Sequence, residues 1–231
     1  MTTFTLMGRT RTELAARVAL DIQEGWYVNL GIGAPEQVAN FIDPHTEVIL
    51  HSENGILGMG GSAPADEIDW DLINAGKRPI QLLQGGVFFD HVTSFSMMRG
   101  GHLDLCILGA FQVSAQGDLA NWWTGNPDEL PAVGGAMDLV AGARRVFVMM
   151  DHVTKDGQPK IVQTCQYPLT GLQAVHRMYT DLAVIDVTEQ GLEVREYVDT
   201  VTFEQLQLLT EAPLRRAQDC RVVALPARGQ P

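Results

Sequence analysis

Glu53 is the residue of this sequence best placed for chemistry, because it follows directly on an apolar run. The run Val48-Ile49-Leu50 predicts a buried strand, and the stretch Ser52–Gly60 after it carries three glycines within six positions. Ligands of open α/β sheets bind beyond the carboxyl ends of the strands. A carboxylate at such a point can act as a nucleophile or a general base. Asn54-Gly55 is also a common turn signal, and spacing alone favours a surface turn over a catalytic site.

The motifs of several other chemistries are missing. The histidines and cysteines show no metal-ligand spacing, and each histidine suits a surface or hydrogen-bonded structural position better than a metal site. No G-x-S-x-G elbow is present for a serine hydrolase. No G-x-x-x-x-G-K-[ST] loop is present either, so a solvated loop position is the default interpretation of Lys77. A carboxylate among glycine loops remains as the candidate chemistry.

A second glycine-rich turn, Gly31-Ile32-Gly33-Ala34-Pro35, follows a predicted strand over 26–30. Strand, glycine turn and helix in this order present backbone N–H groups to an anion. A dinucleotide-binding fingerprint would need a third glycine where Glu36 stands. Tight turns also need glycine for conformational reasons alone, and the spacing by itself slightly favours that explanation.

The elements that must position these residues alternate along the chain. Thr10 and Glu13 form a capping box for a helix that the pattern ends at Gly25. Further helices are expected over 35–41, from 136, over 172–179 and over 202–209, and a helix or coil over 88–98. Strands are expected over 47–50, 80–83, 103–108 and 145–150, with an antiparallel pair at a sheet edge over 182–187 and 192–197. The segment 65–74 reads as a short helix or irregular cover.

This alternation predicts one α/β domain, residues 1–231, built on an open and mainly parallel sheet flanked by helices. The tail at about 226–231 is expected to fray. The long loop Gln116–Val133 contains Asn121-Trp122-Trp123, and long loops in compact domains are disproportionately functional. Its paired tryptophans either pack the loop down or line an interface or pocket.

The composition excludes several classes of partner. The 231 residues carry a formal net charge of −12, which disfavours nucleic acid and anionic membrane surfaces. No apolar run approaches the roughly 20 residues that span a bilayer, and the N-terminus lacks the apolar core of a signal peptide. The three cysteines are odd in number and widely spaced, as in a cytosolic protein with reduced thiols. We therefore expect a cytoplasmic protein.

The stretch SENGILG at 52–58 resembles the S-E-N-G signature of the B (β) subunit of the family I 3-oxoacid CoA-transferases. The resemblance runs nearly end to end, through NLGIGAP (29–35), DLINAGK (71–77), MRGGH (98–102), GDLANW (117–122), GGAMDL (134–139), PLTG (168–171) and TDLAV (180–184). It implies the CoA-transferase fold. Members that act on acetoacetate typically carry lysines in the loop before GGAMDL. Here the loop at 123–133 is acidic and free of lysine, which resembles the 3-oxoadipate branch from aromatic catabolism.

The resemblance implies covalent catalysis on Glu53. The carboxylate attacks the thioester of succinyl-CoA, and a glutamyl-CoA thioester then passes CoA to a 3-oxo acid. A carboxylate suits this chemistry because it is acylated and regenerated without net proton transfer. The backbone N–H of Gly135 matches the family's donor to the oxyanion of the tetrahedral intermediates.

Binding roles also follow from the resemblance. Asn29 and Lys77 are expected to contact a substrate carboxylate, and Gly31 and Gly33 to let the chain approach CoA closely. CoA enters as a substrate, with no permanent cofactor and no metal. An A subunit is expected to supply much of the CoA site, so this chain alone should show little transferase activity.

Three alternatives stay open. The acceptor could be acetoacetate instead of 3-oxoadipate. A CoA-ester hydrolase would use the glutamate to direct water, without a thioester on the protein. A non-catalytic binding module related to sugar-phosphate sensors is disfavoured by the intact S-E-N-G and by the absence of a DNA-binding segment.

Overall fold

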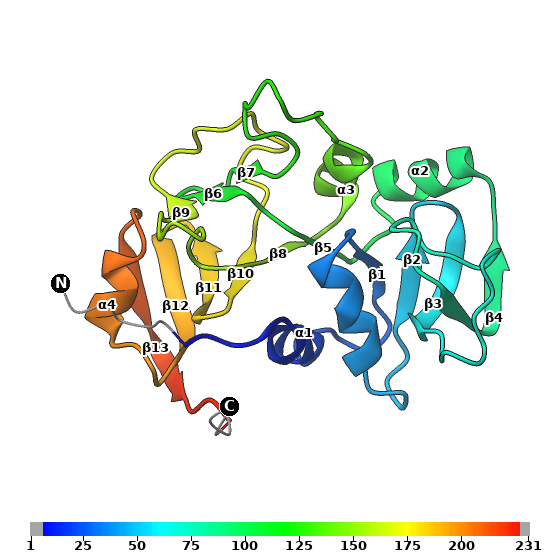
Figure 1. Ribbon diagram of the computed structural model, residues 1–231, viewed down its shortest axis with the longest axis horizontal. Coiled ribbons are helices and arrows are strands. Elements are labelled where there is room, and N and C mark those ends of the chain that lie inside the picture. The colour runs from blue at the N-terminus through cyan, green and yellow to red at the C-terminus, as the bar shows by residue number, and fades with distance from the viewer. Residues whose placement is uncertain (1–6, 227–231) are drawn as a thin grey trace.

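Apolar strands from both halves of the chain lie side by side in one ten-stranded sheet (Figure 1). The computed structural model describes residues 7–226. Across the sheet, the strands follow one another as β13 (Leu214–Val223), β12 (Gly191–Val198), β11 (Ala183–Thr188), β10 (Arg177–Thr180), β8 (Val146–Met150), β5 (Leu105–Leu108), β1 (Tyr27–Leu30), β2 (Ile49–Ser52), β3 (Ile56–Ser62) and β4 (Ile80–Phe88).

The central strands run parallel and the strands outside them turn back. β10, β8, β5, β1 and β2 are parallel neighbours. On one side β3 and β4 continue the sheet antiparallel, and on the other side β11 and β12 do the same. β13 then lies parallel to β12 at the outer edge. The sheet is therefore open and mainly parallel, as predicted, and the parallel centre brings the carboxyl ends of β1, β2 and β5 to one edge.

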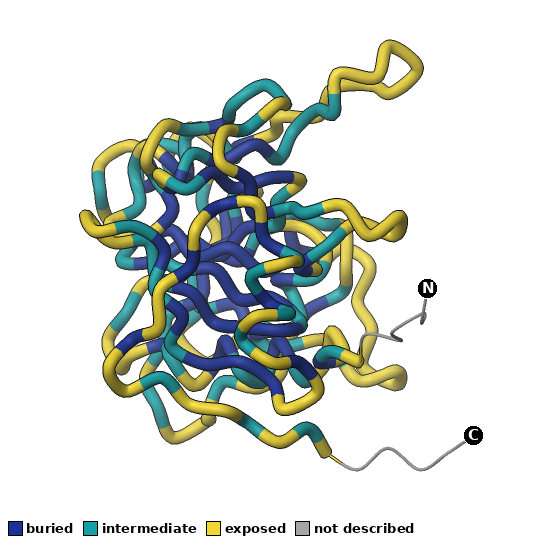
Figure 2. The backbone as a smooth tube through the Cα atoms, turned by 90° about the vertical axis from the view of Figure 1, so that its left-hand side faces the viewer, coloured by how far each residue is buried: buried dark blue, intermediate teal, exposed yellow. Residues whose placement is uncertain are grey.

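Helices cover both faces of this sheet. On one face, α1 (Arg11–Ala19) packs with η1, a 3-10 helix over Ala34–Phe41. The other face carries α2 (His91–Arg99), α3 (Ala136–Gly142), α4 (Phe203–Leu208) and a small sheet of β7 (Leu119–Ala120), β6 (Gln112–Ser114) and β9 (Ile161–Val162). Figure 2 shows the buried residues gathered in the middle of the molecule, with exposed loops around them. Within residues 7–226, every helix is too short or too polar to cross a bilayer.

The central strands are buried on both sides, which explains their unbroken apolar sequences. In β5, Leu105 and Ile107 belong to the core that contains α1, whereas Cys106 and Leu108 belong to the core that contains α3. Alternate side chains of a strand point to opposite faces, so each of the two cores takes every second residue. The rigid middle of the sheet is the platform for the loops at its carboxyl edge.

The first helix begins where the capping box predicts but ends early. The side chain of Thr10 accepts a hydrogen bond from the backbone N–H of Glu13, and the Glu13 carboxylate accepts one from the N–H of Thr10. The helix ends at Ala19, not at Gly25. Gly25, with a φ of 79°, turns the chain into β1 instead. The helix expected at Pro35 is present as η1.

Two predictions for the C-terminal third are wrong. The helix expected over 172–179 is absent, and β10 begins at Arg177. Met178 and Tyr179 are buried in opposite cores, which is the alternation of a strand covered on both faces. The pair β11–β12 is antiparallel as predicted, but it does not lie at the edge. The edge strand β13 carries four charged residues, which hid it from a search for apolar runs.

Residues 202–209 form the predicted closing helix, α4, within one residue at each end. The tail that was expected to fray lies, apart from Pro226, outside the described residues.

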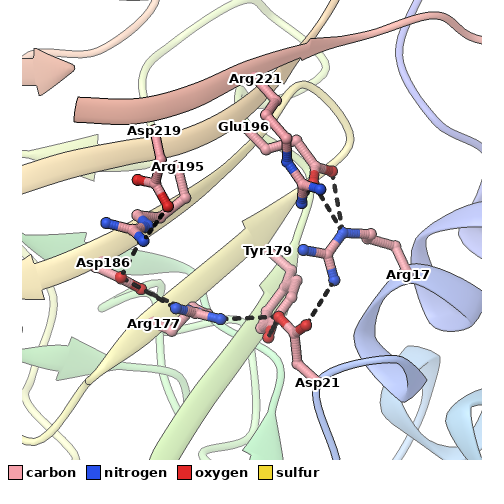
Figure 3. Close-up of polar contacts among 9 residues, drawn as sticks. All are labelled: Arg17, Asp21, Arg177, Tyr179, Asp186, Arg195, Glu196, Asp219 and Arg221. Atoms are coloured by element: carbon pink, nitrogen blue, oxygen red, sulfur yellow. Dashed lines mark hydrogen bonds and ion pairs between the residues drawn. The ribbon is translucent and has the colours of Figure 1, made fainter. Parts of the chain in front are cut away.

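Ion pairs tie α1 to the C-terminal strands (Figure 3). Glu196 of β12 accepts hydrogen bonds from Arg9 at 2.6 Å and from Arg17 of α1 at 3.0 Å. Arg17 also pairs with Asp21, whose carboxylate accepts a 2.6 Å hydrogen bond from the Tyr179 hydroxyl. We call these five residues the α1–β12 network. It joins the beginning of the chain to its last third.

Candidate active site

Glu53 lies in the turn of a β-hairpin at the carboxyl end of β2. The sequence predicted a glycine loop as far as Gly60, but β3 begins at Ile56. The N–H of Gly55 closes the turn on the carbonyl of Ser52 at 2.9 Å. Gly55 has a φ of 109°, and a Cβ there would lie 2.1 Å from the carbonyl oxygen of Phe89. Only glycine fits this position, so the turn that carries Glu53 is fixed by steric necessity.

The two neighbours of Glu53 hold a second turn beside it. The Ser52 hydroxyl accepts a hydrogen bond from the N–H of Ala75 at 3.0 Å, and the Asn54 amide donates one to the carbonyl of Ile73 at 2.8 Å. Ser52 and Asn54 thus bind the 73–75 turn. The Glu53 carboxylate between them makes no such anchoring bond among the described residues and faces a cavity.

This cavity has a volume of about 330 Å³ and lies at the carboxyl ends of β1, β2 and β5. Asn29, Gly31, Glu53, Ala75 and Gly135 are among the residues that line it. Segments far apart in the sequence therefore meet here, as expected for the carboxyl edge of a parallel sheet. A volume of this size is at the lower end of what small-molecule pockets of about 300–1,000 Å³ provide.

Gly135 touches the Glu53 carboxylate. A Cβ on Gly135 would lie 2.3 Å from Oε2 of Glu53 and 3.2 Å from Cζ of Phe95. The φ of Gly135 is −87°, a value that any residue can adopt. Close approach to Glu53, and not backbone conformation, is therefore the reason that glycine stands here.

Burial sets the proton affinity of Glu53. Desolvation raises the pKa of its carboxyl group above the ordinary value, and the charge of Asp138 raises it further. His91, at the first turn of α2, acts in the opposite direction. The His91 ring packs on Phe95 with 4.4 Å between centroids. One face of the carboxylate's surroundings is therefore built by α2.

A chain of buried side chains runs from the cavity to α2. The Asn29 amide lies 3.0 Å from Nδ1 of His51 and donates to the His51 carbonyl at 3.2 Å. Nε2 of His51 lies 3.0 Å from the hydroxyl of Ser94. Burial lowers the pKa of His51 to about 4, so the ring is uncharged at neutral pH. The prediction of a surface or hydrogen-bonded structural histidine was right for His51, but its link to Asn29 has no signal in the sequence.

Three other predicted site residues differ in their position relative to the Glu53 cavity. Gly31 lines the cavity, but its N–H binds the carbonyl of Ile107 at 2.8 Å and a Cβ would meet that oxygen at 2.9 Å. Gly33, with a φ of 97°, starts η1 and lines a separate cavity. Lys77 is exposed, with a φ of 62°, two residues beyond the cavity wall at Ala75. Conformation and strand packing thus account for both glycines.

Asn121 is a cavity residue that the sequence placed only in a long loop. Its amide donates to the carbonyl of Gly109 at 3.1 Å, and its Oδ1 accepts from the Thr170 hydroxyl at 2.6 Å. Trp122 donates from its ring to the carbonyl of Leu169, and its ring lies 6.1 Å from that of Trp123. The tryptophans pack the base of the loop down, while the remainder projects above the sheet between β7 and α3 (Figure 1).

The comparisons with known proteins agree with this geometry. Residues 11–208 match the family model described as Coenzyme A transferase. The chain belongs to this family. It is 63% identical over 205 residues to a protein of Pseudomonas putida named as the B subunit of 3-oxoadipate CoA-transferase, covering 89% of this chain and 96% of that protein.

A second relative and a solved structure are more distant. A Bacillus subtilis protein named as the B subunit of a probable succinyl-CoA:3-ketoacid coenzyme A transferase is 47% identical, over 92% of this chain and 98% of its own length. The crystal structure of an acyl-CoA transferase from Escherichia coli O157:H7 superimposes with a TM-score of 0.71 at 18% identity over 96% of this chain. This chain spans 44% of that transferase. At 18% identity, the likeness supports the fold alone.

Proposed function

We propose that this chain is the B subunit of a 3-oxoadipate CoA-transferase, which moves CoA from succinyl-CoA to 3-oxoadipate together with an A subunit. The relative at 63% identity carries that name. The observation that carries the proposal is the contact between the Glu53 carboxylate and Gly135 in a cavity at the carboxyl edge of the sheet.

The reaction proceeds through acyl transfer to Glu53. The carboxylate attacks the thioester carbonyl of succinyl-CoA, the C–S bond breaks, and CoA leaves as the thiolate, which produces a mixed anhydride. The thiolate attacks the glutamyl carbonyl, and succinate leaves with its carboxylate restored. The carboxylate of 3-oxoadipate then attacks the glutamyl-CoA thioester and expels the thiolate. The thiolate finally attacks the 3-oxoadipyl carbonyl, which yields 3-oxoadipyl-CoA and the free Glu53 carboxylate.

Each attack places negative charge on a carbonyl oxygen. The N–H of Gly135 is the donor we assign to that oxygen, because the backbone at Gly135 touches the Glu53 carboxylate. Loss of one such donor typically costs about 10²–10³ in rate. Burial keeps the Glu53 carboxylate poorly solvated, which makes it a better nucleophile once it is ionised.

Substrate contacts are assigned to Asn29, Gly31, Lys77 and, less directly, Gly33. Asn29 and Gly31 line the cavity from β1 and the turn after it, beside the hairpin. Lys77 is exposed two residues beyond the 73–75 turn that Ser52 and Asn54 hold, and we assign its ammonium group to a substrate carboxylate. Gly33 shapes the turn that follows Gly31. The cavity of about 330 Å³ is too small for a whole CoA molecule, so the nucleotide end must lie outside it, under the A subunit.

The proposal is tested by trapping the thioester. The chain, combined with its A subunit, is incubated with succinyl-CoA, reduced with borohydride and analysed by peptide mass spectrometry. We expect a CoA adduct on the wild-type chain, and after reduction a modified residue at Glu53. Glu53→Gln is the control and should give no adduct. Hydrolysis of succinyl-CoA with no adduct would instead identify a CoA-ester hydrolase.

Acceptor choice requires a separate measurement on the same complex. The relative at 47% identity is named for 3-ketoacids, whereas this chain has an acidic loop at 123–133. We expect kcat/KM for 3-oxoadipate to exceed that for acetoacetate. The reverse order would assign the protein to the 3-ketoacid branch and leave the thioester mechanism in place.

A further inference from the structure

One imidazole ring, that of His51, links a wall residue of the Glu53 cavity to α2. Asn29 is 2% exposed, and His51 and Ser94 are fully buried. Asn29 comes from β1, His51 from β2 and Ser94 from α2, so the Asn29–His51–Ser94 chain crosses three elements. His51 precedes Glu53 by two residues on the hairpin, and its ring lies behind Asn29, outside the residues that line the cavity.

The hydrogen bonds fix the orientation of each group. The backbone carbonyl of His51 can only accept, so the side of the Asn29 amide that faces it must be the NH₂ group. The second hydrogen of that NH₂ group then points at Nδ1 of His51, 3.0 Å away, which makes Nδ1 an acceptor. The proton of the neutral ring must therefore sit on Nε2, where it is donated to the Ser94 hydroxyl.

This orientation decides what Asn29 offers to a substrate. Both of its N–H groups are committed to His51, and within residues 7–226 its Oδ1 has no hydrogen-bond partner. Since Asn29 lines the cavity, the polar atom left for a ligand is an acceptor and not a donor. A substrate carboxylate needs a hydrogen-bond donor, which Asn29 in this orientation does not offer. We therefore replace the role expected from the sequence: Oδ1 of Asn29 accepts a hydrogen bond from an N–H or O–H group of the substrate.

We propose that His51 is a positioning residue for CoA transfer: its Nδ1 holds Asn29 with the side-chain oxygen Oδ1 free for the substrate, and the Ser94 hydroxyl holds the ring in place. This inference rests on the proposed transferase function. The position of Asn29 matters because it lines the same cavity as Glu53 and Gly135. A displacement of about 1 Å in such a site can cost about 10²-fold in rate.

Two substitutions test the two ring nitrogens of His51 one at a time. His51→Asn places an amide oxygen near the position of Nδ1 and keeps an acceptor for Asn29. His51→Gln places its amide near the position of Nε2 and keeps a partner for Ser94 only. In the complex with the A subunit, we expect His51→Gln to lower kcat/KM for succinyl-CoA by about 10- to 100-fold. His51→Asn should keep kcat/KM within about threefold of wild type, because it preserves the acceptor that orients Asn29.

A double-mutant cycle tests whether His51 acts through Asn29. In the Asn29→Ala background, His51→Gln should cause little further loss, because the group that it orients is already gone. Equal damage from His51→Asn and His51→Gln, or full additivity with Asn29→Ala, would overturn the proposal. The control is His152→Asn, which alters another fully buried histidine, bonded to the hydroxyls of Thr180 and Thr210 away from the cavity. It should lower stability without changing kcat/KM.

The orientation itself has a readout independent of activity. In the complex labelled with ¹⁵N-histidine, the His51 signals should show a protonated Nε2 and an unprotonated Nδ1, and the Asn29 side-chain N–H groups should exchange slowly. A protonated Nδ1 would refute the proposed orientation even in a fully active complex. A complex that transfers no CoA would instead refute the proposed function, while the tautomer measurement would still decide the orientation.

Discussion

The Glu53 carboxylate combines burial with the charges of two neighbours. Desolvation and the nearby charge of Asp138 both raise the pKa of the carboxyl group. Only the ionised form is a nucleophile, so kcat/KM should rise with pH as Glu53 loses its proton. The acid limb of the pH profile should consequently lie above the ordinary range of a glutamate.

Asp138→Asn should move that acid limb to lower pH. The substitution removes a like charge, so the pKa of Glu53 falls and the carboxylate persists in more acidic solution. The measurement is the pH profile of kcat/KM with succinyl-CoA for the complete complex. Asp104→Asn is the matched control, because Asp104 also pairs with an exposed arginine but lies away from Glu53. An unchanged limb in Asp138→Asn would show that its charge does not act on Glu53.

Gly135→Ala should impair chemistry without impairing folding. The backbone of Gly135 is in an ordinary conformation, but the new Cβ would overlap Oε2 of Glu53. We expect kcat to fall by about 10²-fold or more, since the carboxylate must move away from the N–H that we propose as the oxyanion donor. The melting temperature should change little. Gly109→Ala, which adds a methyl group to the same cavity without a close contact, should cause a smaller loss.

The sequence indicates the residues of the site whose types are distinctive, and misses those defined by their neighbours. Glu53 and Gly135 could be proposed from their motifs, and the structure brings them into contact. Ser94 could not, because its partner is a histidine 43 positions earlier and a serine in a helix is otherwise ordinary. Gly33 shows the opposite limit, since its glycine has a conformational cause and it lies away from the cavity.

At the level of elements, the β2–β3 hairpin does the positioning. Its turn is held from both sides, by Ser52 and Asn54 to the 73–75 turn and by Gly55 to Phe89. The Glu53 side chain is therefore presented by a fixed backbone, as a nucleophile requires.

Gly55→Ala should destabilise the chain and reduce transfer together. A Cβ at Gly55 would combine a left-handed backbone with a 2.1 Å approach to the Phe89 carbonyl. Gly85→Ala is the matched control, because Gly85 has a φ of 87° but its Cβ would meet nothing within 4 Å. Gly85→Ala should cost about 1–2 kcal/mol from backbone strain alone. In chemical denaturation, Gly55→Ala should lower the free energy of unfolding by more than Gly85→Ala does, and it should also lower kcat. Equal losses in the two variants would show that the hairpin shifts to accommodate the new Cβ.

Periodicity predicted most of the buried strands and the helices, and it failed for β10 and β13. β5 and β8 read as strands because every residue in them is apolar and buried. β13 was missed because its exposed positions carry charges, and only Leu214 and Ala217 are buried in it. Residues 172–179 have apolar side chains at helical spacing, but from Arg177 onward the chain pairs with β8 and β11 as β10.

Across the whole molecule, the α1–β12 network joins distant parts of the chain at one carboxylate. Glu196 is 2% exposed, and Arg9 and Arg17 both bind it. Removal of one partner from a buried ion pair leaves an uncompensated charge in the interior, which is costly.

Glu196→Gln should lower the free energy of unfolding by about 3–5 kcal/mol, because the buried Arg9 guanidinium loses its counter-charge and the partly buried Arg17 keeps only Asp21. Urea denaturation of the purified chain measures this. Asp219→Asn is the comparison: its carboxylate pairs with Arg195 but is 70% exposed, so the loss should be about 1 kcal/mol or less. A loss below about 1 kcal/mol in Glu196→Gln would mean that water or a rearranged side chain replaces the carboxylate.

During synthesis, the α1–β12 network can be completed only after most of the chain has been made. Arg17 precedes Glu196 by 179 positions. At about 5–20 residues per second, the carboxylate is added about 9 to 36 s after the arginine. For that interval the first helix can form its capping box and the local Arg17–Asp21 ion pair, but it cannot bind Glu196. A nascent chain that stops before β12 therefore lacks the carboxylate that binds Arg17 of α1. The first helix gains this ion pair only when β12, in the last third of the protein, has been added.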